Sequence, residues 1–238
     1  MIACRSIPHA VLAQKTTTSE IRPRVDWATT TATRHSLMSR IKRCLRVLGV
    51  DPALAGATGY GVIELQGSAA RMLRFGALRF SSRAGFSERL RKIHKMVSDL
   101  VHEFEPDAVA VESVFAALNV RTALRLAEVR GVILLAAAQA EIPSHSYSPR
   151  EVKASITGHG AASKEQMQQM IQGQLGLCER PEPADAADAL AVALCHAHAA
   201  QAEYRLTHNA LVNSRRAITD SLRRSRSHFP AARIFSER

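Results

Sequence analysis

The sequence predicts an α/β fold, in which a five-stranded mixed sheet is flanked by helices. Two observations support this class. Short apolar runs, at residues 45–51 and 108–112, have the length and composition of buried strands. Segments between and after them, such as 87–104, repeat their apolar residues at helical spacing instead. Strands and helices therefore share one domain.

The first three elements are expected to be strands. They lie at residues 45–51, 60–66 and 71–81. Because only short turns, such as the one at 53–59, join them, we expect an antiparallel meander. The helix at 87–104 follows, and Pro106-Asp107 ends it ahead of the next strand.

The second half of the chain is expected to alternate between strands and helices. After the strand at 108–112, the pattern predicts a helix at about 120–141, a strand at 143–147, and helices at 149–156, 163–175 and 184–200. This order of three strands, a helix, a strand, a helix, a strand and further helices is typical of the ribonuclease H-like layout.

The net charge of +11 lies in the two ends of the chain. Residues 1–44 carry +6 and residues 203–238 carry +5, whereas residues 45–202 have 16 charges of each sign. We therefore expect a disordered basic extension at 1–44, with Met38 as the favoured true start, one folded domain at 45–202, and a disordered basic tail at 203–238. Such ends either bind nucleic-acid phosphates non-specifically or are solvated without a defined role.

The sequence predicts neither a membrane-spanning helix nor a metal site built from cysteines. No apolar run approaches the roughly 20 residues that a membrane-spanning helix needs. The four cysteines, Cys4, Cys44, Cys178 and Cys195, have no metal-ligand spacing, so we expect reduced thiols. This pattern favours a cytoplasmic protein without a membrane partner.

Four carboxylates are the candidate catalytic residues. Asp51 and Glu112 each end a predicted buried strand, and Asp185 and Asp188 lie three residues apart on one face of an Ala-rich helix. Buried acids are costly unless they are paired, protonated or bound to metal, so their convergence predicts divalent cations and phosphate chemistry. Read singly, Asp51 could cap a turn and Asp185 its helix, while Glu112 and Asp188 could be solvated.

Four sequence blocks follow one another in a fixed order. They are Gly49-Val50-Asp51-Pro52 with Thr58-Gly59-Tyr60-Gly61-Val62; Val111-Glu112-Ser113-Val114-Phe115 with Asn119 and Arg130-Gly131-Val132; Pro149-Arg150-Glu151-Val152-Lys153 with Gly158-His159-Gly160 and Ser163-Lys164; and Ala184-Asp185-Ala186-Ala187-Asp188-Ala189-Leu190-Ala191. Together they resemble the RuvC family of Holliday-junction resolvases over residues 45–200. Two positions depart from the family pattern. Ala53 stands where a Gly is usual, and Leu118 stands where a basic residue is common.

The resemblance implies a ribonuclease H-like fold and a structure-specific endonuclease of DNA recombination and repair. It implies a homodimer, with the helix at 120–141 as its surface, that cuts four-way junction DNA by paired symmetric nicks. Asp51, Glu112, Asp185 and Asp188 would bind two Mg²⁺ ions per subunit, for which Mn²⁺ may substitute. A branch-migration complex of the RuvA and RuvB type would be a partner.

Three further residues are expected to contact DNA by the same resemblance. Lys153 and Lys164 would neutralise the scissile phosphate or contact its neighbours, and their alternative is two solvated lysines. Phe115 would stack on unstacked bases, and its alternative is an ordinary core residue. His159 is expected to be a loop residue.

Three other functions remain open from the sequence. The first is a ribonuclease H-like nuclease that acts on RNA or hybrids. The second is a catalytically silent junction-binding protein, although all four acids are present. The third is an actin-like ATPase, which would need a second phosphate loop that we do not find after residue 112.

Overall fold

The computed structural model describes residues 44–53, 56–81, 83–113 and 119–226, and every structural statement below refers to them. Side chains in the last helix are described up to Ser214, except for Leu211. Expectations for residues 1–43, including a start at Met38, and for 227–238 lie outside these ranges. The described cysteines are free thiols. Among the described helices, none is long and apolar enough to cross a membrane.

A five-stranded mixed sheet forms the centre of the domain, with the strand order β3-β2-β1-β4-β5. The strands are β1 (Leu45–Asp51), β2 (Ala57–Gln66), β3 (Ala69–Arg79), β4 (Ala108–Glu112) and β5 (Ser144–Tyr147). The short turns make β1, β2 and β3 an antiparallel meander, whereas β4 pairs in parallel with both β1 and β5. The predicted fold class and meander are confirmed.

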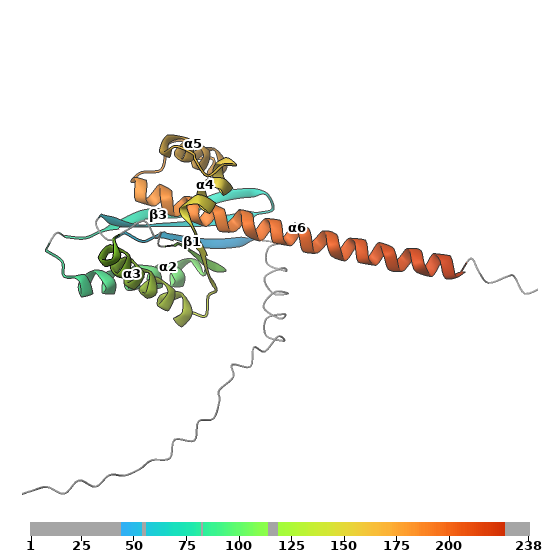
Figure 1. Ribbon diagram of the computed structural model, residues 1–238, viewed down its shortest axis with the longest axis horizontal. Coiled ribbons are helices and arrows are strands. Elements are labelled where there is room, and N and C mark those ends of the chain that lie inside the picture. The colour runs from blue at the N-terminus through green and yellow to red at the C-terminus, as the bar shows by residue number, and fades with distance from the viewer. Residues whose placement is uncertain (1–43, 54–55, 82, 114–118, 227–238) are drawn as a thin grey trace, which may run out of the picture.

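Helices cover both faces of the sheet (Figure 1). Helices α2 (Phe86–Phe104) and α3 (Val120–Gln139) pack on one face, against a core that includes Leu48, Val50 and Val111. Helices α4 (Pro149–Thr157), α5 (Lys164–Leu175) and α6 (Ala184–Arg226) cover the other face. Side chains mark three helix starts: Asn119 accepts from the amide of Thr122, and Ser148 and Ser163 form capping boxes.

Helix α6 is much longer than the sequence analysis predicted. It runs for 43 residues, from Ala184 to Arg226, whereas we expected a helix that ends near residue 200 and a disordered tail from 203. That expectation is wrong for residues 203–226. The polar composition of this segment suggested disorder, but it contains neither Gly nor Pro, so nothing in its sequence breaks the helix.

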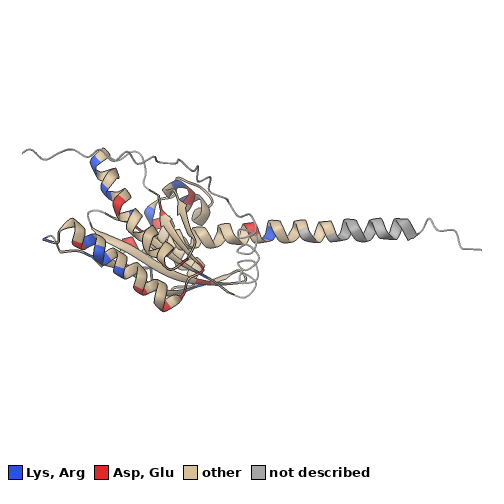
Figure 2. Cartoon of the chain, turned by 90° about the horizontal axis from the view of Figure 1, so that it is seen from below, with Lys and Arg blue, Asp and Glu red and all other residues tan. Residues whose placement is uncertain are grey.

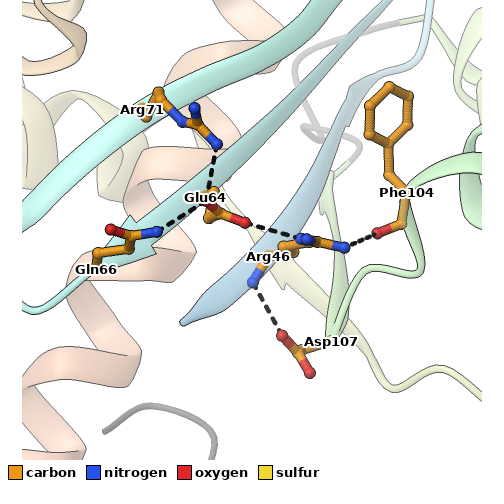
Figure 3. Close-up of polar contacts among 6 residues, drawn as sticks. All are labelled: Arg46, Glu64, Gln66, Arg71, Phe104 and Asp107. Atoms are coloured by element: carbon orange, nitrogen blue, oxygen red, sulfur yellow. Dashed lines mark hydrogen bonds and ion pairs between the residues drawn. The ribbon is translucent and has the colours of Figure 1, made fainter. Parts of the chain in front are cut away.

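A cluster of ion pairs around the buried Glu64 ties the sheet to α2 at the end of β1 that lies away from Asp51 (Figure 3). Glu64 is only 4% exposed and accepts from Arg46 at 2.9 Å and from Arg71 at 3.0 Å. Arg46 also donates to the carbonyl oxygen of Phe104, at the end of α2. Hydrogen bonds from Cys44 and Arg46 lower the pKa of Glu64 to about 2, so its carboxylate stays charged.

Candidate active site

Asp51 and Glu112 lie side by side because of the register between β1 and β4. The strands are parallel, and Val50 pairs with Val111, so the next residue on each strand is an acid at the same edge of the sheet. Side chains alternate along a strand, so both acids face the same side as Gly49 and Ala110. That side is the one that α6 covers.

Three glycines bring α6 directly onto the sheet. Gly59 pairs with Asp51 across the β1–β2 ladder, and Gly49 pairs with Gly61. A Cβ atom at Gly59 would collide with the carbonyl oxygen of Asp185, and one at Gly49 would collide with the helix backbone near Ala189. The backbone of α6 therefore rests on the backbone of β1 and β2, and the helix start lies beside Asp51.

An open cleft of about 280 Å³ brings three of the four predicted acids together. Its lining consists of Asp51, Glu112, Pro149, Val152, Lys153, Lys164, Met167, Asp188 and Ala191. Asp185 is half-buried one turn before Asp188 and is not part of this lining. Lys153 on α4 and Lys164 at the start of α5 line the same cleft, and the Lys164 Nζ is 3.8 Å from a carboxylate oxygen of Asp188.

Burial and mutual repulsion raise the proton affinity of the carboxylates. Desolvation, followed by repulsion from Glu112 and Asp188, raises the pKa of Asp51 to about 8. Desolvation and repulsion from Asp188 raise the pKa of Glu112 to about 6, against an opposing effect of Lys153. Desolvation also raises the pKa of Asp188, which Lys164 partly counteracts. The two lysines therefore offset only part of the negative charge in the cleft.

The donor set fits a hard divalent cation. The cleft offers carboxylate oxygens and no Cys or His, which is the ligand chemistry of Mg²⁺ or Mn²⁺. Within the described ranges, no three acidic, His or Cys side chains are already grouped at metal-binding distance. The acids thus share one cleft but not one coordination shell, as expected for like charges that repel one another.

The other candidate residues differ in where they lie. Phe115 and Leu118 are outside the described residues, so their expected roles stay predictions. His159 is exposed, and its carbonyl oxygen accepts from Thr157 at 2.9 Å. In the loop that begins with Ala53, Gly56 has a φ of 134°, a conformation that favours glycine, as the altered loop requires.

Sequence reasoning missed an aromatic cluster around the buried His196 that joins β5 to α6. Tyr147 pairs with Glu112 in the β4–β5 ladder, and its hydroxyl is 2.8 Å from the Nδ1 of His196. The rings of His145 and His196 lie 4.3 Å apart, and burial lowers the pKa of His196 to about 4. Isolated histidines carry no sequence pattern, so only the tertiary structure reveals that this cluster links the strand beside Glu112 to the helix of Asp188.

Known proteins resemble this chain over the same residues. The family model of the crossover junction endodeoxyribonuclease RuvC matches residues 47–196. The RuvC of Natranaerobius thermophilus is 44% identical over 160 residues, which are 67% of this chain and 99% of that protein. The RuvC of Chloroflexus aurantiacus is 44% identical over 156 residues, which are 66% of this chain and 94% of that protein.

A solved structure matches as well. Thermus thermophilus RuvC in complex with a Holliday junction substrate superposes with a TM-score of 0.64 and 38% identity, over 67% of this chain and 97% of that chain. The family model spans every residue that lines the cleft, from Asp51 to Ala191.

Proposed function

The chain belongs to the RuvC family of crossover junction endodeoxyribonucleases, and we propose from this that it is a Holliday-junction resolvase. It binds four-way junction DNA and nicks two strands, in recombination and DNA repair. The observation that carries the proposal is the register of β1 and β4, which sets Asp51 beside Glu112 in a cleft that Asp188 closes from α6.

The acids are assigned the metal-binding and catalytic roles. Asp51, Glu112, Asp185 and Asp188 would hold two Mg²⁺ ions, for which Mn²⁺ may substitute. When bound, these ions supply the positive charge that activates a water and stabilises the leaving 3′ oxygen. The glycine contacts hold the start of α6 against β1 and β2, and so keep Asp188 in the same cleft as Asp51 before substrate binds.

We assign to the two lysines the role of binding the scissile phosphate. Lys153 and Lys164 line the same cleft as the carboxylates, so a phosphate that enters is within reach of positive side chains. The apolar side chains of Val152 and Met167 lie beside the lysines in the lining of the cleft. Cleavage of the bond between phosphorus and the 3′ oxygen leaves a 5′-phosphate and a 3′-hydroxyl, which a ligase can seal.

Two-fold symmetry of the enzyme would match that of the junction. Helix α3 exposes Val120, Leu124 and Leu135, at 75%, 61% and 52% of their surface, and this apolar side supports α3 as the homodimer surface. Stacking of Phe115 on unstacked bases, a cytoplasmic location, and partnership with a branch-migration complex of the RuvA and RuvB type remain proposals that rest on the family.

Cleavage of a synthetic four-way junction tests the function. The wild type with Mg²⁺ is expected to give paired symmetric nicks in the junction and none in a linear duplex. Asp188→Asn should bind the junction but not cut it, whereas Asp99→Asn, an exposed acid that pairs with Lys95 on α2, should cut normally. Junction binding without nicks in Mg²⁺ or Mn²⁺ would identify a silent binding protein, and cleavage of an RNA–DNA hybrid alone would identify a different nuclease.

A further inference from the structure

Helix α6 continues far beyond the sheet that it covers, and we call its residues 203–226 the α6 arm. Figure 1 shows the arm leaving the domain as a straight extension of the buried segment. Gln201 donates to the carbonyl oxygen of Gly67 at 2.6 Å and so fixes the helix to the β2–β3 turn just before the arm begins. At about 1.5 Å per residue, the arm is roughly 36 Å long.

The arm is basic, although the domain that carries it is electrically balanced. It contains six arginines and two acids, for a net charge of +4, whereas residues 45–202 carry 16 charges of each sign. Figure 2 shows both signs interspersed over the domain. Its arginines stand at positions 205, 215, 216, 223, 224 and 226, so positive charge occurs at both ends and in the middle of the arm sequence.

The arm lies outside the part of the chain that the family shares. The RuvC proteins of Natranaerobius thermophilus and Chloroflexus aurantiacus match over 94% or more of their own length, but they cover only about two thirds of this chain. The family model ends at residue 196, before the arm begins. The chemistry of the cleft therefore does not depend on the arm.

We propose that the α6 arm binds the phosphate backbone of a duplex arm of the DNA substrate. The inference rests on the proposed function for the identity of the substrate. Duplex DNA carries one negative charge per roughly 1.7 Å, so a basic helix of this length matches about ten base pairs of backbone. A second copy of the arm is a poorer partner, because two segments of charge +4 repel each other.

The continuity of α6 gives this contact a defined consequence. Asp188 and the arm belong to one helix, so a duplex on the arm is held in a fixed direction from the cleft. Such a contact raises the affinity for DNA without entering the cleavage step. Loss of the arm charges should therefore raise the KM and leave the kcat unchanged.

The test compares two full-length variants of equal net charge. The arm variant carries Arg205→Gln, Arg216→Gln and Arg223→Gln, and glutamine preserves helix propensity. The control carries Arg91→Gln, Lys92→Gln and Lys95→Gln on α2, on the face of the sheet opposite the cleft. Circular dichroism verifies equal helix content, and fluorescence anisotropy measures the Kd for a 30-base-pair duplex over a series of salt concentrations.

The arm variant is expected to lose at least fivefold in duplex affinity at low salt. Its slope of log K against log salt should fall by about 2 to 3, because each lost phosphate contact contributes roughly 0.9. The control should stay within twofold of the wild type. Equal Kd and slope in both variants would overturn the inference, as would a change of oligomeric state in the arm variant with unchanged duplex affinity.

Junction cleavage by the same proteins separates this inference from the proposed function. If the wild type fails to nick junctions while the arm variant still loses duplex affinity, the proposed function fails and the arm contact stands. If junctions are nicked and the arm variant binds duplex like the control, only the arm contact fails.

Discussion

Replacing Asp51 with asparagine is expected to stabilise the protein in metal-free buffer. Desolvation and the neighbouring acids raise the pKa of Asp51 from 3.8 to about 8. A carboxyl with a raised folded-state pKa costs stability as the pH rises above its unfolded-state value, because folding then requires either a bound proton or a buried charge. Asp51, to which we assign a catalytic role, is thus a source of instability at neutral pH.

The magnitude follows from the interval between the two pKa values. At pH 7 the solution is about 3 pH units above the unfolded pKa, and each unit corresponds to about 1.4 kcal/mol, so the cost is at most about 4 kcal/mol. Water in the open cleft reduces that bound, and we expect asparagine to raise the free energy of unfolding by about 1–3 kcal/mol. For a domain of this size that corresponds to a Tm increase of roughly 2–12 °C.

Thermal unfolding in EDTA at pH 7 and pH 5 measures this effect. The Tm increase of Asp51→Asn should be larger at pH 7 than at pH 5, and the exposed Asp99→Asn should change the Tm little at either pH. Added Mg²⁺ should stabilise the wild type more than Asp51→Asn. An unchanged or lower Tm of Asp51→Asn at pH 7, or an equal increase at both pH values, would refute the electrostatic reasoning.

Three further predictions follow from other contacts. Gly59→Ala should move α6 and lower junction nicking at least 100-fold, whereas Gly173→Ala on α5, where a Cβ meets nothing within 4 Å, should nick normally and unfold at an equal or higher Tm. Glu64→Gln should destabilise the fold by about 1–2 kcal/mol at pH 7 in urea titrations, because the buried carboxylate loses its charge-assisted hydrogen bonds to Arg46 and Arg71. Since the folded-state pKa of Glu64 is about 2 and its usual value is 4.5, the difference should shrink as the pH falls from 4.5 toward 2, and a constant difference would contradict the assignment. Lys164→Met should lower the single-turnover nicking rate 10- to 100-fold, with Lys95→Met as the unaffected control, and equal rates would remove Lys164 from the site.

The sequence predicted the elements whose burial determines their structure. The strands at 45–51 and 108–112 match the predicted ranges, because runs of Val, Leu and Ala with few polar residues have one stable place, in the centre of a sheet. The end of α6 was missed because polarity does not distinguish a solvated helix from a disordered tail.

The candidate site was predicted less evenly than the fold. Asp51 and Glu112 meet because each ends a neighbouring strand, and this is visible in the sequence once the strands are recognised. Asp185 and Asp188 share a helix, yet only Asp188 lines the cleft, since that depends on how α6 lies on the glycines. The contact of Tyr147 with His196 spans 49 residues of sequence, and no local pattern encodes it.

The glycine contacts of α6 also determine which half of the cleft can adapt to a substrate. Where the backbone of α6 rests on that of β1 and β2, no intervening side chain can repack, so the helix of Asp188 and the strand of Asp51 have little room to shift relative to each other. Lys153 and Lys164 stand on α4 and α5, two short helices that end at Gly158 and Gly176 and carry their own caps. We therefore expect Lys153 and Lys164, rather than Asp51 and Asp188, to change position when a substrate of different width enters the cleft.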